Sequence, residues 1–165
     1  MLMNYLNGNL FDSKAPVLVH QVNCRGVMGS GVAKQVKDRY PYVYQEYVQY
    51  CKERPVNELI GSCLIVPIPN SSQYVANIFG QINYGTDGRK YTSYDALDIA
   101  FAKLHDWCRA HGVRKIALPE NMGCNGGGGS WRVVTTLLWH HFFEDLEECV
   151  VYQLDVNKNQ LALPF

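Results

Sequence analysis

Two glycine-rich stretches decide how this chain folds: VNCRGVMGSGVAKQVKDRYP, from Val22 to Pro41, and PENMGCNGGGGSWRVV, from Pro119 to Val134. Each stretch begins where a short apolar run ends, continues through closely spaced glycines, and leads into a segment with helical periodicity. A loop of this kind places the N–H groups of the first helical turn at the positive end of the helix dipole, where a phosphate binds readily. The two stretches therefore predict an α/β domain with a phosphate site.

Short apolar runs alternate with helical patterns along the rest of the chain. The predicted strands are rich in Val, Ile and Tyr and cover 4–6, 17–22, 63–68, 74–79, 115–118 and 149–154. The predicted helices cover 31–40, 42–53, 93–110 and 131–143. Pro41 separates the first two helices, and Ser93 and Ser130 are expected to cap the last two. This alternation predicts helices on both faces of a largely parallel or mixed sheet.

The composition excludes several classes of protein. At 165 residues the chain fits one domain, spanning 1–165, with a core of its own. Fifteen basic residues balance fifteen acidic ones, so bulk attraction to nucleic acid is not expected. No apolar run is long enough for a membrane span, and the N-terminus lacks the pattern of a signal peptide. Six cysteines without metal-ligand spacing predict reduced thiols in a cytoplasmic protein and no metal site. No cofactor is expected.

The two loops differ from the best-known phosphate-binding motifs. The absence of GxxxxGK[ST] excludes a P-loop, and GVMGSG does not fit the dinucleotide-binding pattern. Each loop alone is compatible with a plain structural turn. Two loops at the carboxyl ends of predicted strands favour a nucleotide or sugar-phosphate site, because open α/β sheets bind ligands at that edge. A plain turn would not need the four consecutive glycines 126–129, so they favour a loop that wraps a diphosphate.

Over residues 4–155 the chain resembles the macro domain family. NYLNGNLFD (4–12) is similar to the family's first strand and adenine turn. VNCRGVMGSGVA (22–33) is similar to the distal-ribose loop of the branch with terminal ADP-ribose glycohydrolase and DarG-type antitoxins, and ALPENMGCNGGGGSW (117–131) to its second phosphate loop. ANIFGQINYGTDGRKYTSYDAL (76–97) resembles the middle segment of members that process ADP-ribose-1″-phosphate. The resemblance implies a three-layer α/β/α sandwich with a mixed, largely parallel sheet and ADP-ribose at the strand ends.

The resemblance also implies ligand contacts. Asn9 and Leu10 would lie beside the adenine. The other implied contacts belong to the glycine-rich loops. Those around the distal ribose and phosphate are Met28, Gly29, Ser30, Gly31 and Val32. Those that would cover the diphosphate are Cys124, Asn125, Gly126, Gly127 and Gly128.

Three positions depart from the family pattern. Asn9 replaces the usual aspartate at the adenine turn and keeps an acceptor without its charge. Gln81 stands where the glycohydrolase branch has a lysine, and Gly127 stands where it has a catalytic aspartate. A neutral amide forms no Schiff base and is no general base. The lysine-dependent mechanism of that branch is therefore not expected here.

His20, Asn23 and Gln81 are the candidate catalytic residues. His20 lies in the apolar run VLVHQV, so it is either a hydrogen-bonded core histidine or a general acid/base or phosphate contact near the distal ribose. Asn23 follows the same strand and is expected to contact the ribose hydroxyls. Gln81 is expected to contact the terminal phosphate or ribose, the alternative being a loop contact.

Three functions fit these features. The first is hydrolysis of a distal-ribose derivative of ADP-ribose, above all the phosphatase reaction on ADP-ribose-1″-phosphate. The second is a lysine-independent removal of ADP-ribose from protein or nucleic acid. The third is a non-catalytic module that reads or sequesters ADP-ribose or a related signal derived from NAD. The expected ligand is ADP-ribose or a derivative in all three, with an ADP-ribosylated macromolecule as the partner in the second.

Overall fold

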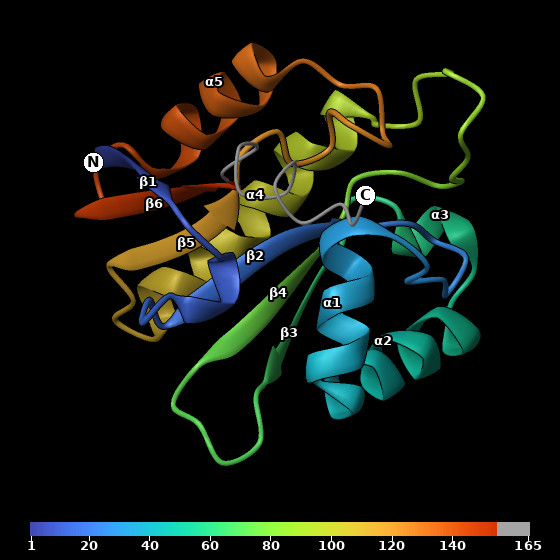
Figure 1. Cartoon of the computed structure of the whole chain (residues 1–165), viewed down its shortest axis with the longest axis horizontal. Helices are drawn as coiled ribbons and strands as arrows, with labels where there is room; N and C mark the ends of the chain where they lie inside the picture. Colours follow the sequence, from blue (N-terminus) through green and yellow to red (C-terminus); the bar gives the residue numbers. More distant parts are fainter. Residues whose placement is uncertain (155–165) are drawn as a thin grey trace, which may run out of the picture.

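The computed structural model describes residues 1–154; residues 155–165, part of the predicted single domain, lie outside the described residues. Within that range six strands form one sheet in the order β1-β6-β5-β2-β4-β3 (Figure 1). Their bounds are β1 Leu2–Asn7, β2 Val17–Val22, β3 Cys63–Pro67, β4 Tyr74–Phe79, β5 Lys115–Pro119 and β6 Glu148–Gln153. All neighbouring pairs are parallel except β3 with β4, which is antiparallel. The predicted mixed, largely parallel sheet is confirmed.

Helices cover both faces of this sheet (Figure 1). One face carries α1 (Gly31–Arg39), α2 (Pro41–Glu53) and the short α3 (Val56–Leu59). The other carries α4 (Tyr94–Ala110) and α5 (Trp131–Phe142). A 3-10 turn, η1 (Leu10–Asp12), follows β1. The result is the expected three-layer α/β/α sandwich, in which no described helix has the length and apolarity to cross a membrane.

Alternate residues of the central strands build two separate cores. On β2, Val17 and Val19 pack toward α4 and α5, whereas Leu18 and Val22 pack toward α1 and α2. Successive side chains of a strand point to opposite faces, so a strand covered on both sides is apolar along its whole length. This explains why the sequence shows continuous apolar runs at β2 and β4.

The predicted element boundaries match the structure to within about two residues. Strands 17–22 and 74–79 are reproduced, and Ser93 caps α4 by accepting a hydrogen bond of 3.2 Å from the Ala96 N–H. Pro41 is the first residue of α2 and not a gap, because the first turn of a helix needs no N–H at that position. Ser130 precedes α5 without the predicted side-chain cap, and its N–H donates to the Tyr94 hydroxyl. The short α3 was not predicted, since four residues carry too little periodicity.

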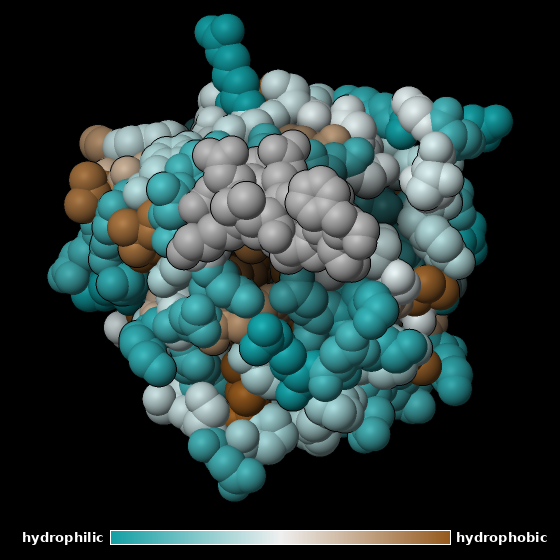
Figure 2. All heavy atoms as spheres, in the orientation of Figure 1, coloured by the Kyte–Doolittle hydropathy of each residue, from teal (hydrophilic) through white to brown (hydrophobic). Residues whose placement is uncertain are grey.

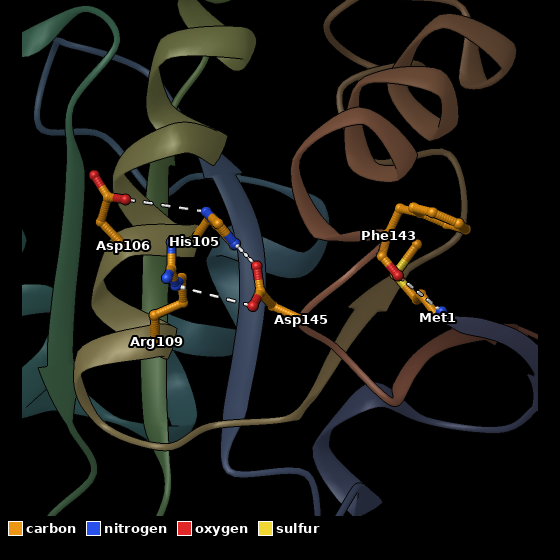
Figure 3. Close-up of polar contacts among 6 residues, drawn as sticks. All are labelled: Met1, His105, Asp106, Arg109, Phe143 and Asp145. Carbon is orange, nitrogen blue, oxygen red and sulfur yellow. Dashed lines mark hydrogen bonds and ion pairs between the residues drawn. The ribbon is translucent and has the colours of Figure 1, made fainter.

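At the amino-terminal edge of the sheet, charged contacts join α4 to the segment after α5 (Figure 3). His105 Nε2 lies 2.5 Å from Asp145 Oδ2, and Arg109 Nε lies 3.9 Å from Asp145 Oδ1. The amino group of Met1 donates to the Phe143 carbonyl at 3.0 Å. These contacts stand at the opposite edge from the glycine-rich loops. On the face turned to the viewer in Figure 2, hydrophilic residues predominate and apolar ones form small separate patches.

A core substitution tests this packing. Ile78 on β4 is fully buried toward α4, so Ile78→Ala is expected to lower the free energy of unfolding by about 2–5 kcal/mol. Ile99 on α4 is 51% exposed, and Ile99→Ala is expected to cost less than about 1 kcal/mol. Urea denaturation of both variants measures the difference. Equal losses would contradict the described core.

Candidate functional site

The two glycine-rich loops lie side by side at one edge of the sheet. The first follows β2 and the second follows β5, and these strands are parallel neighbours. The segment 80–93 follows β4, the other parallel neighbour of β2, and ends at the same edge. Ligands of open α/β sheets bind outside the carboxyl ends of the strands. The topology therefore brings the three segments together as the sequence predicted for the two loops.

Asn23 shapes the first loop from its base. Its Oδ1 accepts hydrogen bonds from the Arg25 N–H at 2.9 Å and from the Tyr47 hydroxyl at 3.0 Å, and its Nδ2 donates to the Val27 carbonyl at 2.7 Å. Asn23 is only 8% exposed. Burial raises the pKa of the Tyr47 hydroxyl, which therefore stays a donor. The structure thus places Asn23 as a support of the loop, and its predicted contact with ribose hydroxyls stays a prediction.

Beyond Val27 the first loop presents unpartnered donors. Among residues 1–154, the N–H groups from Met28 to Ala33 find no hydrogen-bond acceptor. Ser30 stands at the N-cap position of α1, and its hydroxyl makes no capping bond. Gly31 starts the helix at φ +57° with open space where a Cβ would be. Free N–H groups at the positive end of α1 form an anion-binding surface.

The second loop presents a shorter set of donors. The N–H groups of Cys124, Gly128 and Gly129 bond within the loop. Those of Asn125, Gly126 and Gly127 have no acceptor within the described part of the chain. Successive free N–H groups in a turn form a concave nest that suits an anion. Both loops therefore offer backbone donors at the same sheet edge.

A chain of hydrogen bonds runs beneath the second loop. Gln21 Nε2 donates to Gln81 Oε1 at 2.6 Å and to Thr92 Oγ1 at 2.9 Å. The Thr92 hydroxyl in turn donates to the Gly123 carbonyl at 2.6 Å. Gln81 Nε2 donates to the Asn83 carbonyl at 2.8 Å, so both ends of this amide are engaged inside the protein. The predicted contact of Gln81 with a ligand stays a prediction.

The segment 80–93 also contacts the first loop. The Cys24 N–H donates to the Ile82 carbonyl at 3.0 Å, and Arg25 Nε donates to Asn83 Oδ1 at 2.8 Å. This segment therefore joins the two loops into one unit. Sequence reasoning missed Gln21 and Thr92. A polar residue at the end of an apolar strand was the available signal for Gln21, and the polar segment around Thr92 offered none.

The second loop needs its glycines for a different reason from the one predicted. A Cβ at Gly127 would overlap Thr92 Oγ1 and lie 2.6 Å from the Gly123 carbonyl oxygen, and a Cβ at Gly129 would lie 2.8 Å from the same oxygen. At Gly123 it would overlap Gln21 Oε1. The expectation that a structural turn would not need these glycines is therefore wrong: the loop's own packing requires most of them. Gly126 alone in the run faces open space at an unstrained φ.

Position 127 also has no room for an aspartate. The resemblance matches Gly127 with the catalytic aspartate of the glycohydrolase branch, but any side chain there would displace Thr92 or the loop backbone. The packing around residue 127 therefore excludes the aspartate that the glycohydrolase branch has at this position.

His20 lies in the core under the first loop. It is 2% exposed, and its Nε2 is 2.7 Å from Asn77 Oδ1. Asn77 Nδ2 donates to the Leu64 carbonyl at 3.0 Å, which leaves Oδ1 as the acceptor and His20 Nε2 as the donor. Burial lowers the pKa of His20 to about 4, so the ring is neutral at pH 7. This placement matches the core interpretation, and the acid/base role stays a prediction.

The other residues predicted to contact the ligand differ in their burial and in their hydrogen bonds. Asn9 Oδ1 accepts from the Phe11 N–H at 3.0 Å and so caps η1, while Leu10 is 5% exposed and belongs to the core facing α1 and α2. Cys124 is half-buried, and burial raises the pKa of its thiol, which disfavours a thiolate nucleophile. Met28 is buried in the core, whereas Gly29 and Ser30 are exposed.

A mostly parallel sheet with helices on both faces and glycine-rich loops over its strand ends defines the class of α/β domains whose ligand site lies at that edge. The family model of the Macro domain matches residues 19–138. The chain belongs to the macro domain family.

Relatives with known names include two hydrolases. The ADP-ribose 1″-phosphate phosphatase of Saccharomyces cerevisiae is 32% identical over 106 residues, which are 62% of this chain and 59% of the relative. The DNA ADP-ribosyl glycohydrolase of Thermus aquaticus is 32% identical over 132 residues, 79% of this chain and 35% of the relative. The chain thus spans less than two thirds of either relative. Among solved structures, the macrodomain of Mycobacterium tuberculosis DarG matches with a TM-score of 0.78 and 27% identity, covering 93% of this chain and 99% of that one.

The buried histidine predicts a pH dependence of stability. The pKa of His20 is lowered on folding from 6.5 to about 4, so the unfolded chain binds the proton first as the pH falls. The contribution of His20 to the free energy of unfolding is therefore fully present above about pH 6.5. It declines toward pH 4, by up to about 3 kcal/mol. His20→Gln keeps a donor toward Asn77 without the titration, and its unfolding free energy should lack this decline. Parallel pH profiles of the two proteins in urea denaturation would contradict the assignment.

Proposed function

We propose that this chain binds ADP-ribose-1″-phosphate and hydrolyses its terminal phosphate ester. One observation carries the proposal: on two adjacent loops, the backbone N–H groups from Met28 to Ala33 and from Asn125 to Gly127 have no acceptor within residues 1–154. Two such sets suit a ligand with a diphosphate and a further phosphate, because each set donates hydrogen bonds to anionic oxygens without a charged side chain. The similarity to the yeast phosphatase over 106 residues supports the same ligand.

In this proposal the ligand extends along the carboxyl edge of the sheet. The adenine lies near Asn9 and Leu10, and the diphosphate lies under the second loop at 124–128. The first loop, 28–32, holds the distal ribose and its 1″-phosphate. The N–H groups of that loop then stabilise negative charge on the phosphate as it reacts. The positive end of α1 adds to the same effect.

The reaction needs a water molecule and no covalent intermediate. Water attacks the phosphorus, the bond between phosphorus and the C1″ oxygen breaks, and that oxygen leaves as the ribose hydroxyl with a proton from water. The positions of Asn23 and Gln81, both engaged in holding the loops, suit residues that orient and do not transfer protons. His20 contributes as a neutral core residue. Most of the rate enhancement then comes from orientation and from fixed donors.

A non-catalytic reader of ADP-ribose is the second candidate. The observation in its favour is that the side-chain amides of Asn23 and Gln81 are engaged inside the protein, while His20 is a buried, neutral residue of the core. The similarity to the Thermus aquaticus glycohydrolase supports a third candidate, removal of ADP-ribose from DNA or protein. Against this reaction stands residue 127, where the packing leaves no room for the acidic side chain that the glycohydrolase branch uses.

We also infer a reducing, cytoplasmic setting from the six unpaired cysteines.

Phosphate release tests the proposal. Purified protein is incubated with ADP-ribose-1″-phosphate, with ADP-ribosylated DNA and with ADP-ribosylated protein, and each product is quantified. We expect inorganic phosphate and ADP-ribose from the first substrate only. Tight binding of ADP-ribose in calorimetry with no product from any substrate would replace the phosphatase by the reader. Release of ADP-ribose from a macromolecule would favour the glycohydrolase.

A substitution in the second loop tests the binding surface. Gly126 has open space where a Cβ would be, so Gly126→Val leaves the loop packing intact and fills the space assigned to the diphosphate. We expect the dissociation constant for ADP-ribose to rise by at least about tenfold, or about 1.4 kcal/mol, in calorimetry. Ser72→Val, in the exposed turn between β3 and β4, is the matched control and should not change affinity. Equal affinities of the two variants would remove the second loop from the site.

A further inference from the structure

Gln21 lies at the point where β2 passes beneath the loops. Both protons of its side-chain amide are used, one toward Gln81 Oε1 and one toward Thr92 Oγ1. Its Oε1 is buried and has no hydrogen-bond donor among the described residues. A Cβ at Gly80 would lie 2.6 Å from this oxygen, and a Cβ at Gly123 would overlap it. The Cα–H groups of these two glycines therefore face the oxygen. The strand residue therefore requires glycine in two different loops.

Thr92 anchors the second loop at two points. Its hydroxyl donates to the Gly123 carbonyl at 2.6 Å, and its own N–H donates to the Gly127 carbonyl at 2.9 Å. The Tyr91 N–H donates to the same Gly127 carbonyl at 2.8 Å. Thr92 is 3% exposed, so water does not compete for these bonds. The free N–H groups from 125 to 127 lie within the stretch that these anchors enclose.

The anchors matter because the loop is rich in glycine. Glycine loses more backbone freedom on ordering than any other residue. A run from 126 to 129 without external bonds would therefore sample many conformations. The hydrogen bonds from Thr92, which Gln21 orients from below, offset that cost in the free protein. A ligand then meets donors that are already aligned.

We propose that Gln21 and Thr92 are positioning residues that hold the second glycine-rich loop in its anion-binding conformation and so set the affinity for the diphosphate. The ligand named here rests on the proposed function, whereas the control of loop order does not. Neither residue needs to touch the ligand. The same contacts leave no room for a side chain at Gly127, so the loop acts through its backbone.

Removal of the Thr92 hydroxyl tests this role. Thr92→Val keeps the shape of the side chain but removes an acceptor for Gln21 and a donor for Gly123. Thr92→Ser retains the hydroxyl and is the rescue variant. Thr136→Val is the matched control, because the Thr136 hydroxyl donates to the Arg132 carbonyl at 2.8 Å on the exposed face of α5. Hydrogen exchange of the 123–129 segment is read at the amides of Cys124, Gly128 and Gly129, which bond within the loop. Exchange and calorimetry with ADP-ribose are measured on all four proteins, including the unsubstituted chain.

We expect Thr92→Val to speed exchange in 123–129 by at least about tenfold and to weaken ADP-ribose binding by about tenfold, with the amides of β2 and β4 unchanged. Thr92→Ser should restore both values, and Thr136→Val should change neither. Unchanged exchange in 123–129 for Thr92→Val would overturn the proposal, as would faster exchange without loss of affinity. If the unsubstituted chain binds no ADP-ribose, the proposed function fails, and the exchange data still decide whether Thr92 orders the loop.

Discussion

The hydrogen bonds that run from Gln21 through Thr92 to the Gly123 carbonyl are the constraint on which the candidate site depends. They join a central strand, the segment after β4 and the loop after β5. Besides them, within residues 1–154 only the bonds within the loop and the bonds from the Tyr91 and Thr92 N–H groups to the Gly127 carbonyl hold its backbone, because glycine has no side chain that could pack. The loop's remaining N–H groups keep their alignment only while these bonds hold. The binding surface is thus a consequence of polar contacts beneath it.

The sheet topology makes this arrangement possible. β2 lies between β5 and β4, so all three segments that form the site leave neighbouring strands at the same edge. Neighbouring side chains of β2 point to opposite faces of the sheet. His20 bonds to Asn77 across the neighbouring strand β4, whereas Gln21 supports the second loop. One strand therefore stabilises the core and the site at once, and alternation of side chains separates the two tasks.

The sequence predicted the sheet, both helical layers and the place of the two loops, because apolar runs and helical periodicity are local signals. It did not predict the partners of Gln21, which lie 60 and 71 residues away. Contacts at such separation leave no local pattern. The glycine at 127 was predicted for ligand approach, and the structure shows that the Thr92 side chain and the Gly123 carbonyl exclude a Cβ there. His20 allowed two interpretations because burial and pKa follow from packing.

In the proposed function, the N–H groups of both loops that have no acceptor within residues 1–154 bind the diphosphate and distal phosphate of one ligand. An NMR titration of the nitrogen-15 labelled protein with ADP-ribose tests it directly. We expect the amide resonances of 28–33 and 125–127 to shift together and to saturate at one ligand concentration, while those around Trp107 and His111, at the opposite sheet edge, stay in place. Saturable shifts confined to other residues, or shifts in one loop without the other, would contradict it.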